Sequence, residues 1–541
     1  MKDPQKRISR AKPEAHTLDP TPLLLSSTLG ANEVDRLLRP YGFERPAQAD
    51  ANLQAMAGHP EERRALSVIL ADLLWAIGET ADPDQALNFW DHYIATGVQR
   101  RSLFQFLGQA PRMLHLMSMI FGNSPAMAET LIRDPMLMYW LVEEQVESRA
   151  PTRRQMNDDL RKSLATFQRY DMKGDALRRF KRREMLRIGI RDMLRVADVS
   201  ETVGSLSDMA NVLIQAVYEL ADEYFRAQHG TPSHRDRHGQ LTRTGFVVMG
   251  MGKLGGGELN YSSDVDLVYL YETGDGETQS ANGQLPISND EYFEKLAREI
   301  TRVLDVTTDE AAIFRVDLRL RPEGDIGAVA KSLEDSVHYY RTRGRDWERM
   351  AFIKAYPIAG AKPIGRLFLR RIRSFILGKK NATTQDVLQT VRSLKLKIHT
   401  KLLRRGEETR HVKLGVGGIR EIEFLVQALQ LLHVHQTPQV MERNTIKALA
   451  LLGGVKILSE ESVEQLNSAY RFLRDLEHKL QMVNDLQTHV LPRDLEEVAK
   501  CAVRMGYPKG ESYAKTAQAF LDDYGHHTSV VHRLYQQTIG L

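Results

Sequence analysis

Apolar residues recur at spacings of three and four through the first part of the chain, from Glu33 to about Tyr224. This period places them on one face of a helix, so the pattern predicts a helical N-terminal region over residues 31–240. Residues 1–30 offer too few apolar residues for a secretory signal, and we expect a flexible tail there. Clear examples of the helical spacing are Ala65, Val68, Ile69, Leu73 and Leu74, followed by Leu103, Phe106, Leu107 and Leu114.

The middle of the chain changes to patterns that are typical of strands. Short apolar runs occupy Phe246–Met249 and Val265–Tyr271, and Ile313–Leu320 alternates apolar with charged residues. Strict alternation predicts a strand with two different faces. Before the third run, a capping box at Ser288 starts a helix that reaches about Leu304. We therefore predict a small mixed sheet with helices, forming a catalytic core over residues 241–332.

Helical spacing returns at Leu333, which predicts a C-terminal helical domain over residues 333–541. The chain contains neither a fixed-period repeat nor a low-complexity segment, so solenoid architectures are not expected. The predicted fold class is α+β and mostly α-helical, with one sheet domain flanked by helical units.

Composition narrows the location and the partners of the protein. The most apolar segment, Leu114–Phe121, is interrupted by polar residues and is far shorter than the roughly 18 apolar residues of a membrane span. A single cysteine, Cys501, excludes an intramolecular disulfide and a cysteine-based zinc site. The net charge of +4, from 74 basic and 70 acidic residues, does not favour nucleic-acid binding through a large positive field. We expect a cytoplasmic protein that binds neither membrane nor nucleic acid.

A glycine-rich segment between the first two predicted strands carries the candidate chemistry. It starts at Gly250 and satisfies the dinucleotide-binding pattern G-x-G-x-x-G, but turn residues follow where that fold needs a full helix. A P-loop fails as well, because Leu254 follows Lys253 where a serine or threonine should bind magnesium. The segment ends in Asp264 and Asp266, at the head of the second predicted strand.

The aspartates indicate a metal site. Side chains alternate along a strand, so Asp264 and Asp266 share one face. Asp317 lies on the charged face of the third predicted strand, and it joins the first two if the strands are neighbours. Three carboxylates in one cleft repel one another, and hard divalent cations between them make the ionised state favourable. Magnesium is the natural candidate, and two such ions would suit transfer at phosphorus.

Other residues nearby are of types that bind phosphate. Glycines let the backbone approach a phosphate, lysine adds positive charge, a serine hydroxyl donates a hydrogen bond, and arginines donate paired bonds. The candidates for nucleotide or phosphate binding are Lys253, Gly255, Gly256, Ser262, Ser263, Arg319 and Arg321.

The combination is more specific than any of its parts. A strand, paired glycines, a serine, D-x-D and a later aspartate together resemble the active-site plan of the DNA polymerase β nucleotidyltransferase superfamily. Within it, the chain resembles the family of the glutamine synthetase adenylyltransferase and adenylyl-removing enzyme. The segments that carry this resemblance are Gly250–Leu270, Phe314–Pro322 (FRVDLRLRP), Gly344–Lys354 (GRDWERMAFIK), Lys413–Phe424 (KLGVGGIREIEF) and Leu476–Pro492.

Members of that family typically carry two related nucleotidyltransferase units, of which the N-terminal one removes AMP and the C-terminal one attaches it. This chain has one set of a glycine-rich turn, D-x-D and a later aspartate. Its residues around Met251 and in the GRDWER segment are more similar to those of the removing unit. The resemblance implies Asp264, Asp266 and Asp317 as catalytic ligands of Mg²⁺. The implied reaction removes AMP from a tyrosine of glutamine synthetase with phosphate, giving ADP. The implied partners are adenylylated glutamine synthetase, the PII signal protein, phosphate and an adenine nucleotide.

Two other functions stay open at this point. The same fold could transfer AMP from ATP to a protein, or it could be a non-catalytic regulatory module. The three aspartates weigh against the module, because it has no reason to concentrate like charge on one face. At Arg420, Glu421 and Glu423, which follow a glycine turn, we expect a salt bridge between domains rather than a catalytic role.

Overall fold

The computed structural model shows a chain folded into two compact units, each built from segments that are distant in sequence. Unit 1 comprises Met1–Ala150, Arg183–Thr202 and Asp475–Tyr524, and unit 2 comprises Pro151–Arg182, Val203–Arg474 and Gly525–Leu541. The structure describes residues 18–26, 29–143, 146, 148–279, 285–378, 384–483 and 485–540.

This division differs from the consecutive regions 31–240, 241–332 and 333–541 that the sequence patterns suggest. Long-range hydrogen bonds explain the difference in unit 1. The Ala126 amide donates to the Val483 carbonyl at 3.2 Å, and the Arg504 Nε donates to the Asn123 carbonyl at 3.1 Å. Such contacts attach residues 475–524 to the N-terminal helices and leave no trace in local hydrophobic spacing.

Unit 1 is helical, as the sequence predicts. In its core, Trp90 packs edge-on against Phe121 and donates its indole N–H to Ser118. In the described part of the expected tail, the helix over Pro22–Leu25 buries Leu23 and Leu24 and is therefore packed; residues 1–17 lie outside the described residues. The helices are α2 (Pro22–Leu25), α3 (Ala31–Leu38), α4 (Pro46–Ala57), α5 (Pro60–Gly78), α6 (Pro83–Ala95), α7 (Arg100–Gln109), α8 (Pro111–Asn123), α9 (Pro125–Arg133), α10 (Leu137–Glu143) and α24 (Leu495–Arg504).

Two sheets lie in unit 2. The larger has the strand order β6-β4-β3-β8, with β7 also paired to β4, and the smaller has the order β2-β1-β5. Strand β4 is antiparallel to β3 and parallel to both β6 and β7. The strands are β1 (Thr231–Arg235), β2 (Leu241–Arg243), β3 (Phe246–Gly250), β4 (Val265–Tyr271), β5 (Glu277–Gln279), β6 (Val316–Asp317), β7 (Ala330–Ser332) and β8 (Tyr356–Gly360).

The structure corrects two predictions about strands. The strand expected over Ile313–Leu320 is confined to Val316–Asp317, because the chain turns directly afterwards, with the Arg321 amide donating to the Leu318 carbonyl at 3.1 Å. Strands β1 and β8 lie outside the expected core of 241–332. They pair with strands inside it, a tertiary contact that neither segment's own pattern indicates.

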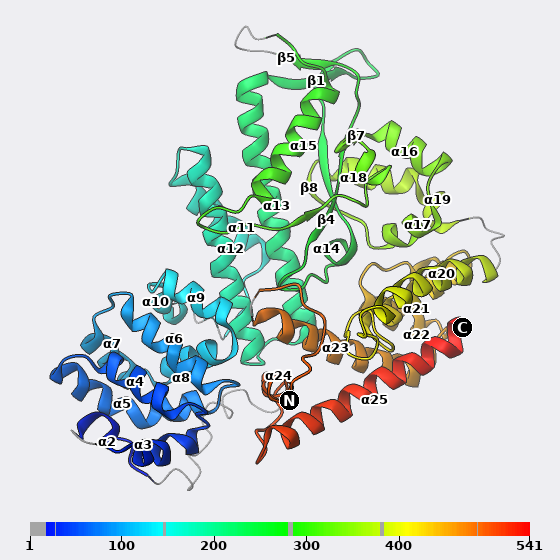
Figure 1. Ribbon diagram of the computed structural model, residues 1–541. Coiled ribbons are helices and arrows are strands. Elements are labelled where there is room, and N and C mark those ends of the chain that lie inside the picture. Colours follow the sequence, from blue (N-terminus) through cyan, green and yellow to red (C-terminus); the bar gives the residue numbers. More distant parts are fainter. Residues whose placement is uncertain are drawn as a thin grey trace. The chain divides into compact units, whose positions relative to one another are not determined.

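Helices cover both faces of the larger sheet. On one face Val247 and Val268 pack with Tyr340 of α16 (Leu333–Thr342). On the other, Phe246 stacks on Phe293 of α15 (Asn289–Asp305) with ring centroids 5.6 Å apart. Figure 1 shows α15 and α13 (Val199–His229) on one side of β4, and α16 and α18 (Lys362–Arg371) on the other. A sheet covered on both sides can offer a site only where its strands begin or end.

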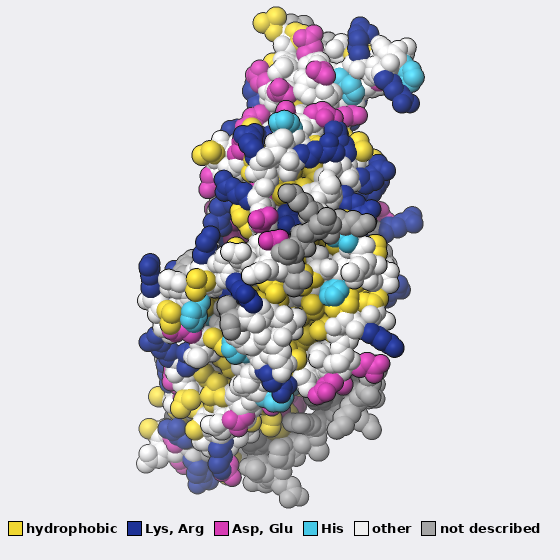
Figure 2. Space-filling model, turned by 90° about the vertical axis from the view of Figure 1, so that its right-hand side faces the viewer, with side chains coloured by type: hydrophobic (Ala, Val, Ile, Leu, Met, Phe, Trp, Pro, Cys, Tyr) yellow, Lys and Arg dark blue, Asp and Glu magenta, His cyan; other side chains and the backbone are white. Residues whose placement is uncertain are grey.

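The remaining helices surround this sheet or are divided between the units. None of the described helices is long and apolar enough to cross a membrane. On the face shown in Figure 2, basic and acidic side chains are interspersed, in agreement with the nearly balanced charge of the chain. These helices are α11 (Arg153–Ala165), α12 (Tyr170–Met193), α17 (Asp346–Ile353), α19 (Arg373–Leu377), α20 (Thr384–Leu403), α21 (Ile419–His433), α22 (Thr445–Gly454), α23 (Glu460–Met482) and α25 (Tyr513–Ile539).

The aromatic stack on the sheet gives a first prediction. Phe246 is 1% exposed and stacks on Tyr218, Tyr269 and Phe293. Phe246→Ala should lower the free energy of unfolding by about 3–5 kcal/mol, because it removes a buried ring and leaves a cavity. Urea unfolding followed by circular dichroism measures this. The control Leu241→Ala, at a 53% exposed position, should change it by less than about 0.5 kcal/mol, and equal effects would contradict the prediction.

Candidate active site

The parallel pairing of β4 with β6 brings two of the predicted aspartates side by side. Asp266 is the register partner of Asp317, and residues paired in this way project to the same face of the sheet. Burial and the charge of Asp317 raise the pKa of Asp266 to about 6, and the charge of Asp264 adds to this effect. The structure therefore places Asp266 beside Asp317, and Asp264, just before β4, is close enough for its charge to act on Asp266.

Two arginines neutralise the other two carboxylates. The Arg315 Nε donates to Asp264 Oδ1 at 2.7 Å, and the Arg319 Nε donates to both carboxylate oxygens of Asp317 at 3.0 Å. The hydrogen bonds from Arg319 lower the pKa of Asp317. With the side chains in these positions, the described part of the chain has no group of three His, Cys, Asp or Glu residues close enough to bind one metal ion. A cation shared by the aspartates requires both arginines to turn away.

The turn after β3 passes directly over the Asp266 carboxylate. Gly252 has a φ of +52°, and a Cβ added there would lie 2.5 Å from Asp266 Oδ2, so only glycine fits. Gly255 and Gly256, both predicted to contact phosphate, are buried in α14 (Gly252–Gly256). A Cβ on Gly255 would lie 2.1 Å from the Lys354 carbonyl oxygen. The close approach that Gly255 allows in this arrangement is therefore to the chain's own backbone.

The other predicted phosphate ligands differ in their accessibility. Lys253 and Ser263 are half-buried, whereas Ser262 is buried and its Oγ accepts a hydrogen bond from Arg315 at 3.3 Å. Arg319 is exposed and bonded to Asp317. The Arg321 guanidinium is buried and donates to three backbone carbonyls, which commits it to the turn after β6. Those carbonyls belong to Leu318, Asp325 and Gly327.

Sequence reasoning assigned no site role to two basic residues near the aspartates. The positive charges of Lys413 and Arg420 act on Asp266 and oppose the rise in its pKa. Their segment, Lys413–Phe424, stood out only through its resemblance to known proteins, because a single basic residue carries no spatial signal. Cationic side chains from this segment therefore act on the same carboxylate as the anionic side chains of Asp264 and Asp317.

A buried ion cluster lies behind the glycine turn. The Lys354 Nζ donates to Glu258 at 2.7 Å, to Glu423 at 3.0 Å and to Thr445 at 3.1 Å. Burial alone would lower the pKa of Lys354, but the two carboxylates outweigh it and raise that pKa. Burial would likewise raise the pKa of Glu423, whereas Lys354 and Arg420 bring it well below its usual range. The salt bridge expected at Glu423 thus forms, and it lies within unit 2.

Two further arginines fix the same turn from the C-terminal helices. The Arg443 Nη1 donates to the Gly255 carbonyl at 2.7 Å, and its guanidinium stacks over the Tyr356 ring at 3.7 Å. The buried Arg474 donates to the Glu258 carbonyl at 2.7 Å and to the Asn260 side chain. Segments that are far apart in sequence therefore hold the backbone between β3 and Asp264.

The larger sheet, the glycine turn and the paired aspartates form an α+β domain flanked by helices, and this arrangement fits the nucleotidyltransferase domain that the sequence predicts. Residues 114–371 match the family model described as glutamate-ammonia ligase adenylyltransferase, and this segment contains the larger sheet with all three aspartates. Residues 392–539, in the C-terminal helices, match the model described as GlnD PII-uridylyltransferase.

Similar proteins carry the name bifunctional glutamine synthetase adenylyltransferase/adenylyl-removing enzyme. The protein from Thioalkalivibrio sulfidiphilus is 36% identical over 73% of this chain and 40% of its own length. That from Pseudomonas aeruginosa is 37% identical over 72% of this chain and 39% of its own length, and that from Stenotrophomonas maltophilia is 40% identical over 62% and 35%. The chain thus spans about two fifths of the length of the first two of these relatives.

The buried cluster predicts a large effect of one substitution. Lys354→Met should lower the free energy of unfolding by about 3–5 kcal/mol, because it leaves the carboxylates of Glu258 and Glu423 buried without their shared cation. Thermal and urea unfolding measure the loss. Lys295→Met, which removes the exposed partner of Glu291, is the matched control and should cost less than about 1 kcal/mol. A loss no greater than that of the control would mean that the cluster is not needed for the fold.

The pKa values of the aspartates predict opposite effects of two substitutions in the absence of divalent cations. The raised pKa of Asp266 means that its ionisation weakens the folded state as the pH rises from about 4 to 6, so Asp266→Asn should stabilise the protein at pH 7 by about 1–3 kcal/mol. This gain should vanish near pH 4, where Asp266 is protonated in the folded chain. Asp317→Asn should be destabilising at pH 7, since the folded state lowers the pKa of Asp317. Melting temperatures between pH 4 and 8 test both signs; a stability loss in Asp266→Asn at pH 7 contradicts the electrostatic argument.

Proposed function

We propose that this chain removes AMP from an adenylylated tyrosine of glutamine synthetase by phosphorolysis, giving ADP, and so takes part in regulating nitrogen assimilation. The observation that carries the proposal is the pairing of Asp266 with Asp317, beside Asp264, in a domain matched by the glutamate-ammonia ligase adenylyltransferase model. The names of the relatives support the substrate, because they combine adenylyl transfer with adenylyl removal on glutamine synthetase.

Mg²⁺ fits the chemistry of the proposed ligands. Oxygen ligands are those that magnesium prefers, and a bound cation would offset both the burial and the repulsion from Asp317 that raise the pKa of Asp266. Asp266 would hold the metal together with Asp264 and Asp317 once Arg315 and Arg319 release them. A bound magnesium supplies charge stabilisation at the adenylyl phosphorus and at the oxygens that enter and leave.

The residues of the chain bind and orient the reactants in the proposed reaction. A phosphate oxygen attacks the adenylyl phosphorus, the bond from phosphorus to the tyrosine oxygen breaks, and the tyrosine hydroxyl regains a proton. Arg319, when released from Asp317, is exposed and able to hold the attacking phosphate by paired hydrogen bonds. Lys413 and Arg420 add positive charge next to Asp266. Arg321 is not proposed for this role, because its guanidinium is committed to backbone carbonyls.

The opposite direction, transfer of AMP from ATP, is the second candidate. It is favoured by the relatives' names, which include adenylyltransferase, and carboxylate-held metals serve either direction equally well. We favour phosphorolysis because the segments around Met251 and Trp347 resemble those of the adenylyl-removing unit. PII is a further proposed partner, supported by the description of the family matched over residues 392–539. We propose a cytoplasmic location, which agrees with such a role.

Turnover tests the proposal directly. The protein incubated with adenylylated glutamine synthetase, phosphate and magnesium should release ADP, and omission of either phosphate or metal should stop the release. Asp266→Asn should lower the rate by at least about 10³-fold, because a neutral amide is a poor magnesium ligand. Arg319→Lys should raise the phosphate concentration needed for half-maximal rate by about tenfold, since lysine cannot donate a bidentate pair.

Controls separate the alternatives. Arg298→Lys, at an exposed residue paired with Glu294 in the same domain, should leave both parameters unchanged. Incorporation of labelled AMP from ATP into unmodified glutamine synthetase, without phosphate-dependent release, would establish the transferase instead. Absence of both reactions would favour a non-catalytic module.

A further inference from the structure

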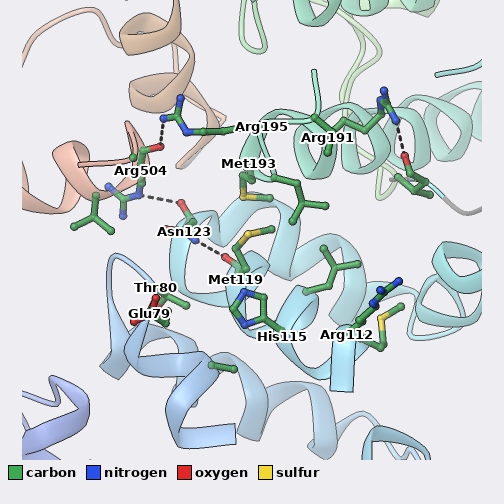
Figure 3. Close-up of a pocket in the computed structure, with 18 of the residues that line it drawn as sticks. Glu79, Thr80, Arg112, His115, Met119, Asn123, Arg191, Met193, Arg195 and Arg504 are labelled. Carbon is green, nitrogen blue, oxygen red and sulfur yellow. Dashed lines mark hydrogen bonds between the residues drawn. The ribbon is translucent and has the colours of Figure 1, made fainter. Parts of the chain in front are cut away.

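Unit 1 contains a cavity of about 1320 Å³ that no residue of the candidate active site lines. Its walls come from α8, the end of α12, and the end of α24 with the residues that follow it, as Figure 3 shows. The volume exceeds the roughly 300–1,000 Å³ of typical small-molecule sites, so a metabolite fits with room for water. The cavity is therefore large enough to be a binding site in its own right.

One wall is a polar stripe on an otherwise buried helix. Arg112, His115, Met119 and Asn123 follow one another along α8 at spacings of three and four, and all four line the cavity. The other faces of α8 are packed in the core of unit 1. In Figure 3 the His115 ring lies between the walls of the cavity. Burial lowers the pKa of His115, and the nearby Glu79 opposes that shift.

The end of α24 presents Arg504, on which the carboxylates of Glu497 and Asp82 act only at longer range than an ion pair. The Arg504 Nε donates to the Asn123 carbonyl, and its carbonyl accepts from Arg195 at 3.2 Å (Figure 3). Among the described residues, no carboxylate forms an ion pair with Arg504, and no hydrogen bond engages its two Nη atoms. Loss of hydration lowers the pKa of this guanidinium. A half-buried guanidinium costs free energy unless an anion or water satisfies its remaining donors.

The described side chains that line the cavity include more cations than anions. Arg191, Arg195 and Lys479 are paired with Glu201, Asp475 and Asp192, which do not line it. Arg112 and Arg504 form no ion pair with a described residue, and the Lys509 ammonium donates only to the Gly78 carbonyl. Among the described residues that line the cavity, Glu79 is the one carboxylate, compared with the three cations Arg112, Arg504 and Lys509.

We propose that this cavity binds a small organic anion that carries phosphate or carboxylate groups. Arg504 would bind an anionic group at one end, and Arg112, at the first turn of α8, would bind a second group. Between them, Met119 and Met193 offer flexible apolar surface to a carbon skeleton. The inference does not depend on the proposed activity, because the cavity and the aspartates lie in different units.

Titration calorimetry of the full-length chain tests the proposal with three probes, namely citrate, inorganic phosphate and ADP. At least one should bind wild-type protein, and Arg504→Gln should weaken that binding by about tenfold or more. Arg112→Glu is the second variant. It removes no hydrogen bond to a described residue, so it should fold normally and still weaken binding by a similar factor through charge reversal. Citrate binding would identify a carboxylate ligand, and phosphate or ADP binding a phosphorylated one.

Two matched substitutions locate the binding. Arg36→Gln, at an exposed residue of α3 outside the cavity, should leave affinity unchanged. Arg319→Gln distinguishes the candidate active site, and it too should leave binding in the cavity unchanged. The proposal is overturned if none of the three probes binds at millimolar concentration, if Arg112→Glu and Arg504→Gln bind as wild type does, or if only Arg319→Gln abolishes binding.

Discussion

Three segments of unit 2 meet at the buried ammonium of Lys354. It is shared by Glu258, in the segment between the glycine turn and Asp264, and by Glu423, in α21. Because charges of this kind are stable in a protein interior only when paired, these three segments have to meet in one arrangement. The net contribution of such a cluster to stability is small, since desolvation offsets attraction, but alternative arrangements leave a carboxylate unpaired and are costly. The Thr445 hydroxyl and the Arg474 side chain complete the same arrangement.

The candidate site also contains partly buried acidic side chains near basic ones, but there the pKa of the central carboxylate shifts in the opposite direction. Burial acts to raise the pKa of both carboxylates, but cations around Glu423 outweigh its burial and lower its pKa, whereas at Asp266 burial and then the charges of Asp317 and Asp264 raise the pKa. The ion cluster behind the turn is thus electrostatically satisfied, while the aspartates in front of it are not. Arg315 and Arg319 reduce this repulsion at Asp264 and Asp317 and leave Asp266 without such a partner. The site therefore combines a fixed backbone with side chains that have reason to rearrange when a cation binds.

A nearly neutral total charge conceals strong local differences. The chain has 74 basic and 70 acidic residues, yet three aspartates of unit 2 lie close enough to act on one another, and the described residues that line the cavity of unit 1 include more cations than carboxylates. Both are features of tertiary structure, since Arg112 and Arg504 are almost 400 residues apart in sequence. Net charge is an argument about long-range fields and solubility, and it does not report on either of these sites.

The sequence by itself determined the local structure. The period of 3.6 predicts the helices, the apolar runs predict β3 and β4, and Ser288 caps α15 as its pattern predicts, because these signals depend on neighbouring residues alone. The D-x-D spacing and the alternation around Asp317 likewise identify Asp266 and Asp317, which the structure pairs, and Asp264, whose charge acts on Asp266. Pairing of distant segments was decided only in the tertiary structure. It adds β1 and β8 to the sheets, shortens β6, joins residues 475–524 to unit 1, and turns Gly255 and Arg321 toward the protein's own backbone. It also brings Lys413 and Arg420 close enough to act on Asp266, because charges interact through space and chain distance does not limit them.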